Sequence, residues 1–327
     1  KAKKRGRTKT NQRLKQGNEA PGGFSFNYTS KKNGVDENEA PVTQKVEHIL
    51  QEIERLEPKI RATEFYALLE KTLMAFIEIV PQEMVCYGLG SLEHAPTGSN
   101  CLHQLVLADL IRKLLSIPSI LIFDPILKEV DIVLAEKLGF QLLQVNEAGK
   151  RLASKRTLFF MPHCPMRLYS NLLWTNWGSF LANTIIIGNS FAAYDRRTLV
   201  AATGEGGDGG GGDTNAVLAA RRWRGAREAP LPFRPRARFK EDGDQDGVLL
   251  PNGYAAFHDL SLMWFSEQAP IYTTDQGALV EEGGGTGPYL VVEDAETEAS
   301  RTDALPERPP EYIPAESGAI GGEAELL

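Results

Sequence analysis

The sequence predicts an α/β fold: a Rossmann-like, doubly wound and mostly parallel sheet of about five strands, preceded by two helices. Short apolar runs alternate with segments of helical periodicity from position 84 to about position 190. The runs are apolar throughout, as expected for strands that are covered on both faces. Strands that alternate with helices of about ten to fifteen residues are typical of right-handed βαβ units in a parallel sheet.

Two helices are expected before the sheet. The first has apolar residues at i, i+3, i+4, i+7 and i+10, which places Val46, Ile49, Leu50, Ile53 and Leu56 on one face. Thr43 is a candidate N-cap for this helix, and Pro58 is expected to end or interrupt it. A second helix is predicted over 65–76.

The alternating region gives expected strands over 84–90, 119–125, 140–147, 157–164 and 183–191. The helices between them are expected over 100–115, 128–139 and 166–177. Asp109 interrupts the apolar face of the first of these helices, and a solvated position is expected for it. A later segment, 254–268, has helical character and is expected to pack back on the domain.

The composition divides the chain into five regions. We expect a basic disordered arm over 1–40, the α/β domain over 41–200, a disordered low-complexity insertion over 201–247, a C-terminal element of the same domain over 248–272 and an acidic disordered tail over 273–327. The net charge of -7 conceals eight Lys or Arg in residues 1–16, with no acidic residue among them. This arm is interpreted as a flexible tail or a nuclear import signal, and sequence-specific nucleic-acid binding is not expected.

Cysteine content and hydropathy bear on the compartment. Cys86, Cys101 and Cys164 are too few and too scattered for a disulfide framework, which favours a reducing compartment. No apolar run approaches the roughly 20 residues needed to cross a bilayer. We therefore expect a cytoplasmic or nuclear protein, or one found in both, without a membrane partner.

Polar residues recur where the expected strands end. Ligands of open parallel sheets bind outside the carboxyl ends of the strands, so these positions should line one rim. Asn146 and Glu147 end the third strand. The residues that we predict to bind a ligand there are Gly88, Gly90, Ser91, Gln104, Asp124, His163, Asn189 and Ser190.

The glycine turn is open to two interpretations, a plain turn or a ligand-binding loop. Gly88 and Gly90 give G-x-G, but Glu93 occupies the position of the third glycine of a dinucleotide fingerprint. The helix begins only near Ser99 or Asn100, too far along the chain for that fingerprint, and Glu93 would repel a pyrophosphate. NAD is therefore disfavoured.

Asp124 and the Asn189-Ser190 pair also keep two interpretations each. Asp124 stands where nucleotide folds place a ribose-binding acid, but it lies 34 residues after Gly90, against about 20 in the fingerprint. The alternative is that it caps the following helix. Asn189 and Ser190 could bind a ligand or form an ordinary helix cap.

His163 is the candidate catalytic residue, as a general acid or base, with a metal ligand and a structural histidine as alternatives. The possible metal ligands His94, Cys101, His103, His163 and Cys164 lack the spacing of a metal motif, so no metal site is predicted. Cys164 lacks the signature of a nucleophile. No cofactor is assigned.

Several of these segments together resemble one family. "CYGLGS", "HQL", "FDP", "NEAGKR", "FFMPHC", "LYSNLLWTNW", "IIGNSF" and "AFHDLSLMWF" occur in order with sensible spacing and resemble the SRR-type family, named for a plant phenotype of reduced sensitivity to red light. The resemblance implies a regulatory role: phytochrome signalling and circadian timing in plants, clock-gene expression and haem biosynthesis in animals, and microtubule-related phenotypes in yeast. It implies no reaction.

Three functions follow as expectations. The first is a regulatory protein in clock-linked or haem-linked control, whose rim binds a small-molecule ligand or a protein partner. The second is an enzyme that uses a nucleotide-type cofactor such as S-adenosylmethionine, with His163 as acid or base and Asp124 on a ribose. The third is a scaffold whose rim residues only stabilise turns and whose partners bind through the tails. The sequence does not decide whether a reaction is catalysed.

Overall fold

The computed structural model describes residues 40–93, 99–196, 215–223, 225–233 and 253–266. The predicted acidic tail, and the predicted basic arm apart from residue 40, lie outside these residues. Within them a seven-stranded sheet has the strand order β3-β2-β1-β4-β5-β7-β6. The mixed α/β class and the mostly parallel sheet are therefore confirmed, and the expected number of about five strands is too small.

The first five strands run parallel, and the last two are antiparallel to their neighbours. Their bounds are β1 Glu83–Tyr87, β2 Ile120–Phe123, β3 Gln141–Leu142, β4 Thr157–Met161, β5 Thr184–Asn189, β6 Ala226–Pro230 and β7 Leu260–Phe265. The expected third strand, 140–147, shrinks to the two residues of β3.

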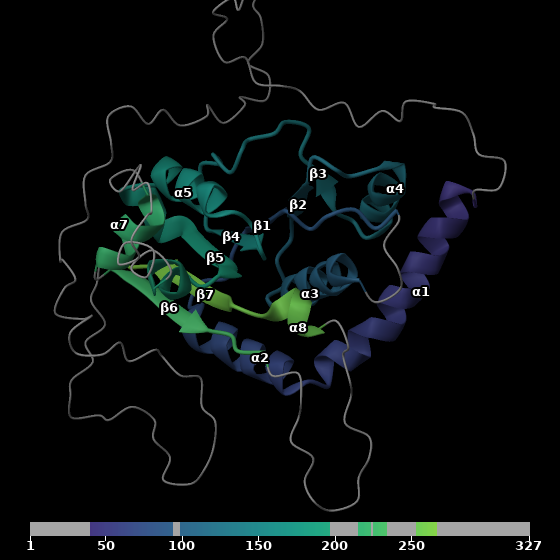
Figure 1. Cartoon of the computed structure of the whole chain (residues 1–327), viewed down its shortest axis with the longest axis horizontal. Helices are drawn as coiled ribbons and strands as arrows, with labels where there is room; N and C mark the ends of the chain where they lie inside the picture. Colours follow the sequence, from purple (N-terminus) through teal and green to yellow (C-terminus); the bar gives the residue numbers. More distant parts are fainter. Residues whose placement is uncertain (1–39, 94–98, 197–214, 224, 234–252, 267–327) are drawn as a thin grey trace, which may run out of the picture.

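Helices cover both faces of the sheet (Figure 1). On one face lie α1 (Val42–Arg61), α2 (Glu64–Phe76), α3 (Asn100–Leu114), α4 (Glu129–Lys137) and α8 (Gly253–Phe257). On the other lie α5 (Met166–Thr175) and α7 (Ala216–Arg222). A short 3-10 helix, Ser179–Asn183, leads into β5, and residues 191–196 are helical.

The sheet side chains explain the uniformly apolar strands. In β1, Met84 and Cys86 face the α3 side, whereas Val85 and Tyr87 face the α5 side, and all four are buried. Burial of both faces removes the polar alternation of a half-exposed strand. The pattern that predicted a covered parallel sheet was therefore interpreted correctly.

The first helix differs from the expectation at both ends. Thr43 is not its N-cap: the helix begins at Val42 after Pro41, which makes no side-chain capping bond. Pro58 lies inside the helix, which continues to Arg61. A proline removes only one backbone donor, and the fully buried Ile60 keeps the last turn packed on the domain.

Two late segments were assigned wrongly. Residues 216–222 and 226–230, within the expected disordered insertion, form α7 and β6. The segment 254–268, expected to be helical, gives the short α8 and then the strand β7. In β7, Leu260 and Leu262 face one core and Met263 and Phe265 face the other. An apolar run that is buried on both sides cannot be distinguished from a buried helix by periodicity alone.

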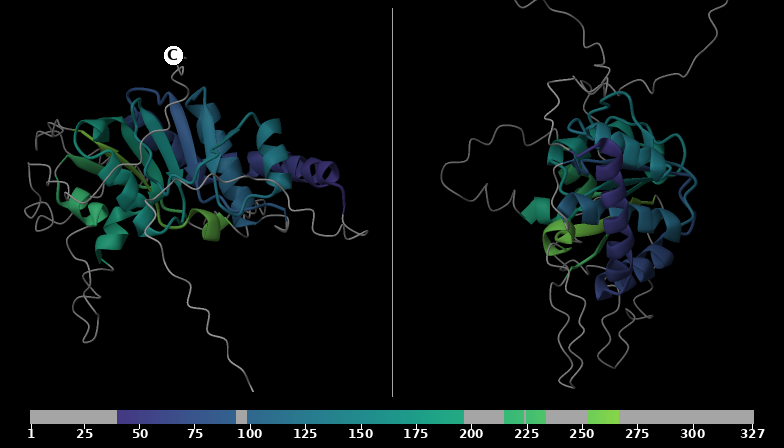
Figure 2. Two further views of the ribbon diagram at one scale, coloured as in Figure 1. Left: turned by 90° about the horizontal axis from the view of Figure 1, so that it is seen from above. Right: turned by 90° about the vertical axis from the view of Figure 1, so that its right-hand side faces the viewer.

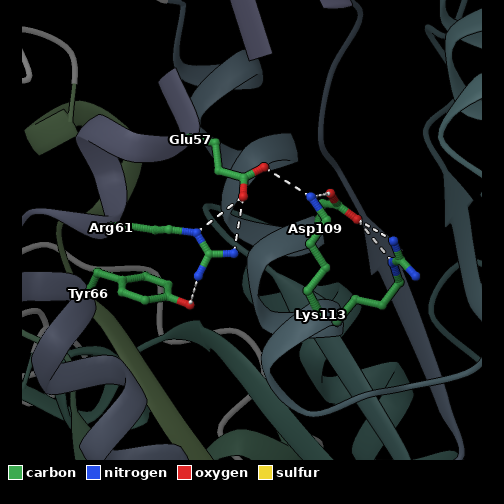
Figure 3. A network of polar contacts seen from close by, with 6 residues as sticks. Glu57, Arg61, Tyr66, Asp109 and Lys113 are labelled. Atoms are coloured by element: carbon green, nitrogen blue, oxygen red, sulfur yellow. Dashed lines mark hydrogen bonds and ion pairs between the residues drawn. The ribbon is translucent and has the colours of Figure 1, made fainter. Parts of the chain in front are cut away.

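A charged network fastens α1 to α3 (Figure 3). Lys113 Nζ lies 2.9 Å from Glu57 Oε2 and 2.9 Å from Asp109 Oδ2. Arg61 contacts Glu57 at 3.1 Å, and Arg112 contacts Asp109 at 2.7 Å. The expected solvated position of Asp109 is wrong: the residue is buried, and its carboxylate forms ion pairs with Arg112 and Lys113.

None of the helices in the described ranges combines the length and the apolar character that a membrane crossing requires. Figure 2 shows the sheet and its helices from two further directions.

We predict that Asp109→Ala lowers the free energy of unfolding by about 2 kcal/mol, because two cations lose a buried, charge-assisted partner. Urea-induced unfolding measures the change. The matched control is Arg55→Ala, which removes an exposed pair with Glu52 and should cost less than about 0.5 kcal/mol. Equal losses in the two variants would contradict the prediction.

Candidate functional site

The candidate site is the rim of loops at the carboxyl ends of β1, β2, β4 and β5, formed by residues 88–92, 124–126, 162–165 and 189–190. The strand order places β1 next to β4, with β2 and β5 on their outer sides. The connection after β1 leads to one side of the sheet and the connection after β4 to the other, so the loops diverge there. This is the switch point at which open α/β sheets bind ligands.

The glycine loop after β1 depends on its two glycines. Gly88 and Gly90 have φ of 74° and 77°, a region that favours glycine. A Cβ on Gly88 would lie 2.7 Å from Cys164 Sγ, and one on Gly90 would lie 2.6 Å from Cys101 Sγ. The loop therefore packs its backbone directly on two thiols, and this alone accounts for both glycines.

Asp124 holds this loop to the end of β2. Its Oδ2 accepts the Gly90 N–H at 2.9 Å and its Oδ1 accepts the Ile126 N–H at 3.1 Å. The side chain is buried, and each of its two oxygens accepts one backbone N–H. Asp124 does not cap α4, whose N-cap position is Lys128.

Asp131 of α4 anchors the rim loops, a role that the sequence analysis missed. It accepts the Ser91 hydroxyl at 2.5 Å, the Leu92 N–H at 2.7 Å and the Lys128 N–H at 2.8 Å. It is the third residue of α4, where an acidic side chain can return to the N-cap amide. That spacing was the available signal. The bond from the Ser91 hydroxyl to Asp131 shows that Ser91 has a partner within the protein.

Asn189 fixes the turn after β4. Its Oδ1 accepts the His163 N–H at 2.7 Å, and its Nδ2 donates to the Cys164 carbonyl at 3.2 Å. Its backbone N–H donates to the Tyr169 hydroxyl at 2.9 Å, and that hydroxyl donates to the Met161 carbonyl. The φ of 54° at His163 is held in place by these bonds.

Two predicted rim residues converge on one backbone carbonyl. His163 Nε2 lies 3.1 Å and Gln104 Nε2 lies 3.4 Å from the oxygen of Ala256, the fourth residue of α8. The His163 ring also stacks on His258 at 4.5 Å. His163 as a residue is exposed, yet its ring is packed, and this burial lowers its pKa, with the neighbouring His258 acting in the same direction.

Ser190 forms a helix cap, which is one of the two roles predicted for it. Its Oγ accepts the Ala193 N–H at 3.1 Å at the start of the helical residues 191–196. Its own N–H donates to the Asp259 carbonyl at 2.8 Å, which ties the end of β5 to the residue before β7. Each predicted polar residue of the rim is thus engaged by the chain itself.

Cys164 is a buried thiol whose pKa is raised to about 12, mainly by burial and further by Asp124. Its Sγ donates to the Tyr87 carbonyl at 3.4 Å. A thiol held neutral is a poor nucleophile. Among the described residues no three His, Cys, Asp or Glu side chains gather as a metal ion would require; His94 lies outside them.

The connection from β3 to β4 is a strap, residues 143–156, without a helix. Tyr87 at the end of β1 donates its hydroxyl to Glu147 Oε2 at 2.6 Å. Arg151 contacts Glu147 at 2.7 Å and Glu83, the first residue of β1, at 3.4 Å. The strap therefore runs along one face of β1, where a doubly wound sheet usually carries a crossover helix.

Asn171 of α5 and Asn176, which directly follows α5, anchor this strap, a role that the sequence analysis did not assign. Asn171 Nδ2 donates to the Ala148 carbonyl at 2.8 Å. Asn176 accepts the Ala153 N–H at 2.7 Å and donates to the Arg151 carbonyl at 2.8 Å. Amide side chains on either side of the apolar run 172–174 were the signal. Asn146 only closes a local turn, since its Oδ1 accepts the Ala148 N–H at 2.9 Å.

We predict that Gly90→Ala destabilises the protein more than Gly139→Ala. Gly139 has a φ of 74°, and a Cβ there meets nothing within 4 Å. Its replacement should cost about 1 kcal/mol of left-handed strain, whereas Gly90→Ala adds an overlap worth about 1–3 kcal/mol. Thermal denaturation measures both changes.

Adding Cys101→Ala to Gly90→Ala removes the sulfur and should recover the extra loss. Equal losses at the two glycines, or the absence of recovery, would show that the loop does not pack on the thiol.

Comparison with known proteins supports one family. The model of the SRR1 domain matches residues 32–264, which takes in the helices α1 to α8 and all but the last residue of β7. No solved structure matches the chain.

Relatives carry the same family name. The chain is 32% identical over 200 residues to Protein SENSITIVITY TO RED LIGHT REDUCED 1 of Arabidopsis thaliana, covering 59% of this chain and 63% of that protein. It is 38% identical over 119 residues to an SRR1-like protein of Mus musculus, covering 35% and 47%, respectively. The chain thus spans less than two thirds of these relatives. On the family match and this shared core, the chain belongs to the SRR1 domain family.

Proposed function

We propose that this chain is a regulatory protein that acts by binding a partner at the rim and not by catalysis. The observation that carries the proposal is that Asp124, Asp131 and Asn189 are committed to backbone groups of the rim itself. Because these side chains hold the rim loops in place, they determine the shape of the rim surface that a partner would contact. A buried polar group without a hydrogen-bond partner costs free energy. A ligand that bound these side chains would break their bonds to the backbone and would have to offset that cost.

The fold supports binding at this place. The order β3-β2-β1-β4-β5 supports a Rossmann-like doubly wound sheet with its switch point between β1 and β4. We infer that the rim is the binding surface of this family.

Two exposed apolar side chains support a protein partner. Ile126 lies three residues after β2 and is 56% exposed, and Val145 lies three residues after β3 and is 45% exposed. Because β2 and β3 are neighbours, these side chains stand at adjacent strand ends. Contiguous exposed apolar patches that are rimmed by polar residues mark partner contacts, and we propose that these two side chains belong to such a patch.

The enzyme alternative has less support. A ribose would need the Asp124 carboxylate, but both of its oxygens accept backbone N–H groups. His163 Nε2 is already hydrogen-bonded to the Ala256 carbonyl, so an acid or base at His163 would have to act beside this bond. The same contacts disfavour a nucleotide-type cofactor such as S-adenosylmethionine.

The family suggests the processes that are regulated. One relative is named for reduced sensitivity to red light, which supports a role in light-dependent or circadian-clock-linked signalling. Regulation of haem biosynthesis is the second pathway that we propose, and it rests on the family resemblance alone.

The test is complementation of cells that lack the endogenous protein. We predict that Ile126→Asp combined with Val145→Asp abolishes complementation while urea unfolding changes by less than about 0.5 kcal/mol per site, because both side chains are exposed. The matched control is Met74→Asp on α2, which is 57% exposed and precedes the start of β1 at Glu83 in the chain. Full complementation by the double variant would contradict the proposed surface.

A second variant separates regulation from catalysis. His163→Ala in an enzyme that uses this residue as acid or base should lower activity by about a hundredfold or more. The proposed regulator should complement in proportion to its folded fraction. Loss of complementation by a fully folded His163→Ala protein would favour the enzyme.

We propose a cytoplasmic and nuclear location, with residues 1–16 as an import signal, on the basis of their eight Lys or Arg. Fluorescence imaging of the chain with and without these residues tests it. Deletion should lower the nuclear fraction, and an unchanged distribution would remove the proposed role.

A further inference from the structure

The edge of the sheet opposite the rim, which we call the amino edge, is where β1, β4 and β5 begin. It is formed by residues 77–82 before β1, 154–156 before β4 and 178–183 before β5. Strand β7 runs antiparallel to β5, so it ends at this edge, and Ser266 directly follows it. The last described residue of the chain therefore lies at the amino edge.

Three apolar side chains of the amino edge are exposed. Ile79 and Val80, before β1, are 63% and 50% exposed, and Phe180, in the 3-10 helix before β5, is 38% exposed. Beside the loop before β1, the rings of Phe76 and Trp264 stack at 4.7 Å and are only partly buried. The end of α2 thus lies on the end of β7, and the chain crosses from there to β1.

Hydrogen bonds hold the loops of this edge side by side. The Gln82 N–H donates to the Arg156 carbonyl at 2.9 Å, and Arg156 Nη1 donates to the Ala182 carbonyl at 3.1 Å. Neighbouring strands lie about 4.8 Å apart, so the loops before β1 and β5, on either side of β4, are about 10 Å apart. Their apolar side chains therefore border one surface, and contiguous exposed apolar surfaces mark contacts with another segment.

The chain leaves the described residues beside this surface. The pairing of β4 with β5 and of β5 with β7 places Ser266 in one row with Arg156, two strand spacings or about 10 Å away. The loop before β1 is one spacing further, at about 14 Å. Five residues span at most about 17 Å, and the fifth and sixth residues after Ser266 are Ile271 and Tyr272.

Charge favours the same segment. Residues 267–300 contain eight Asp or Glu and no Lys or Arg. Arg156 stands in the middle of the amino edge, and its buried Nε has no acceptor among the described residues. Glu78 balances part of its charge. An acidic segment that crosses this row therefore meets a cation with a spare donor.

We propose that residues 267–275, "EQAPIYTTD", fold back along the amino edge and place Ile271 and Tyr272 on the surface formed by Ile79, Val80 and Phe180. A segment joined to its binding surface by a few residues has an effective concentration of about millimolar, which favours it over a separate chain. The SRR1 match ends at residue 264, so this cover is an addition to the matched domain. The amino edge is closed to other chains while the segment is docked.

Thiol labelling of the full chain tests the contact. Val80→Cys at the amino edge and Val145→Cys beyond the carboxyl end of β3 are each treated with a maleimide, and peptide mass spectrometry assigns the label. Ile271→Asp combined with Tyr272→Asp should accelerate labelling of Val80→Cys by about tenfold, because the docked segment loses two apolar contacts. The same pair should leave the rate at Val145→Cys unchanged.

The matched control is Leu279→Asp combined with Val280→Asp, which lie further along the same acidic segment and should change neither rate. An unchanged rate at Val80→Cys in the Ile271→Asp, Tyr272→Asp protein would overturn the proposal, as would equal acceleration by the control pair. Protection of Val80→Cys that rises with protein concentration would also overturn it, in favour of a second copy of the chain. No rim partner is present in this experiment, so the contact and the proposed function fail separately.

Discussion

The rim depends on backbone amides that are received by a few buried polar side chains. Parallel strands end in loops whose N–H groups find no partner in the sheet, and a buried donor without an acceptor costs about 1–3 kcal/mol. Asp124 supplies an acceptor for the first loop, Asp131 for the same loop and the start of α4, and Asn189 for the turn after β4. The loops can then pack tightly, which explains why Gly88 and Gly90 lie directly on thiols.

The strap extends the same principle to the rest of the sheet. With no helix between β3 and β4, one face of β1 is covered by irregular backbone, whose polar groups need partners of their own. Asn171 of α5 and Asn176 directly after α5 provide them, and the bond from Tyr87 to Glu147 fixes the strap at the carboxyl end of β1. The segments "NEAGKR" and "LYSNLLWTNW" are thus two halves of one structural unit. The residues of these two motifs hold loops in place.

Much of this fold could be predicted from periodicity, because long apolar patterns such as those of α3 and β4 reflect burial directly. The errors have a common physical cause. Pro58 and the strand β7 follow tertiary packing where local preference suggested otherwise, and β6 lies in a segment whose neighbours are rich in glycine. The site was predicted as a set of residues, but their roles depend on partners that are far apart in sequence. Asn189, for example, receives its donor from a residue 26 positions earlier.

The central claim is that the rim's polar side chains serve its own backbone. Hydrogen exchange of individual amides by NMR in native conditions measures this directly. The account predicts that the amides of Gly90, Leu92 and His163 are protected to nearly the same degree as those of the neighbouring strands, although all three lie in loops. Exchange of these amides at the rate of exposed loop residues would contradict it, because Asp124, Asp131 and Asn189 would then be available to a ligand.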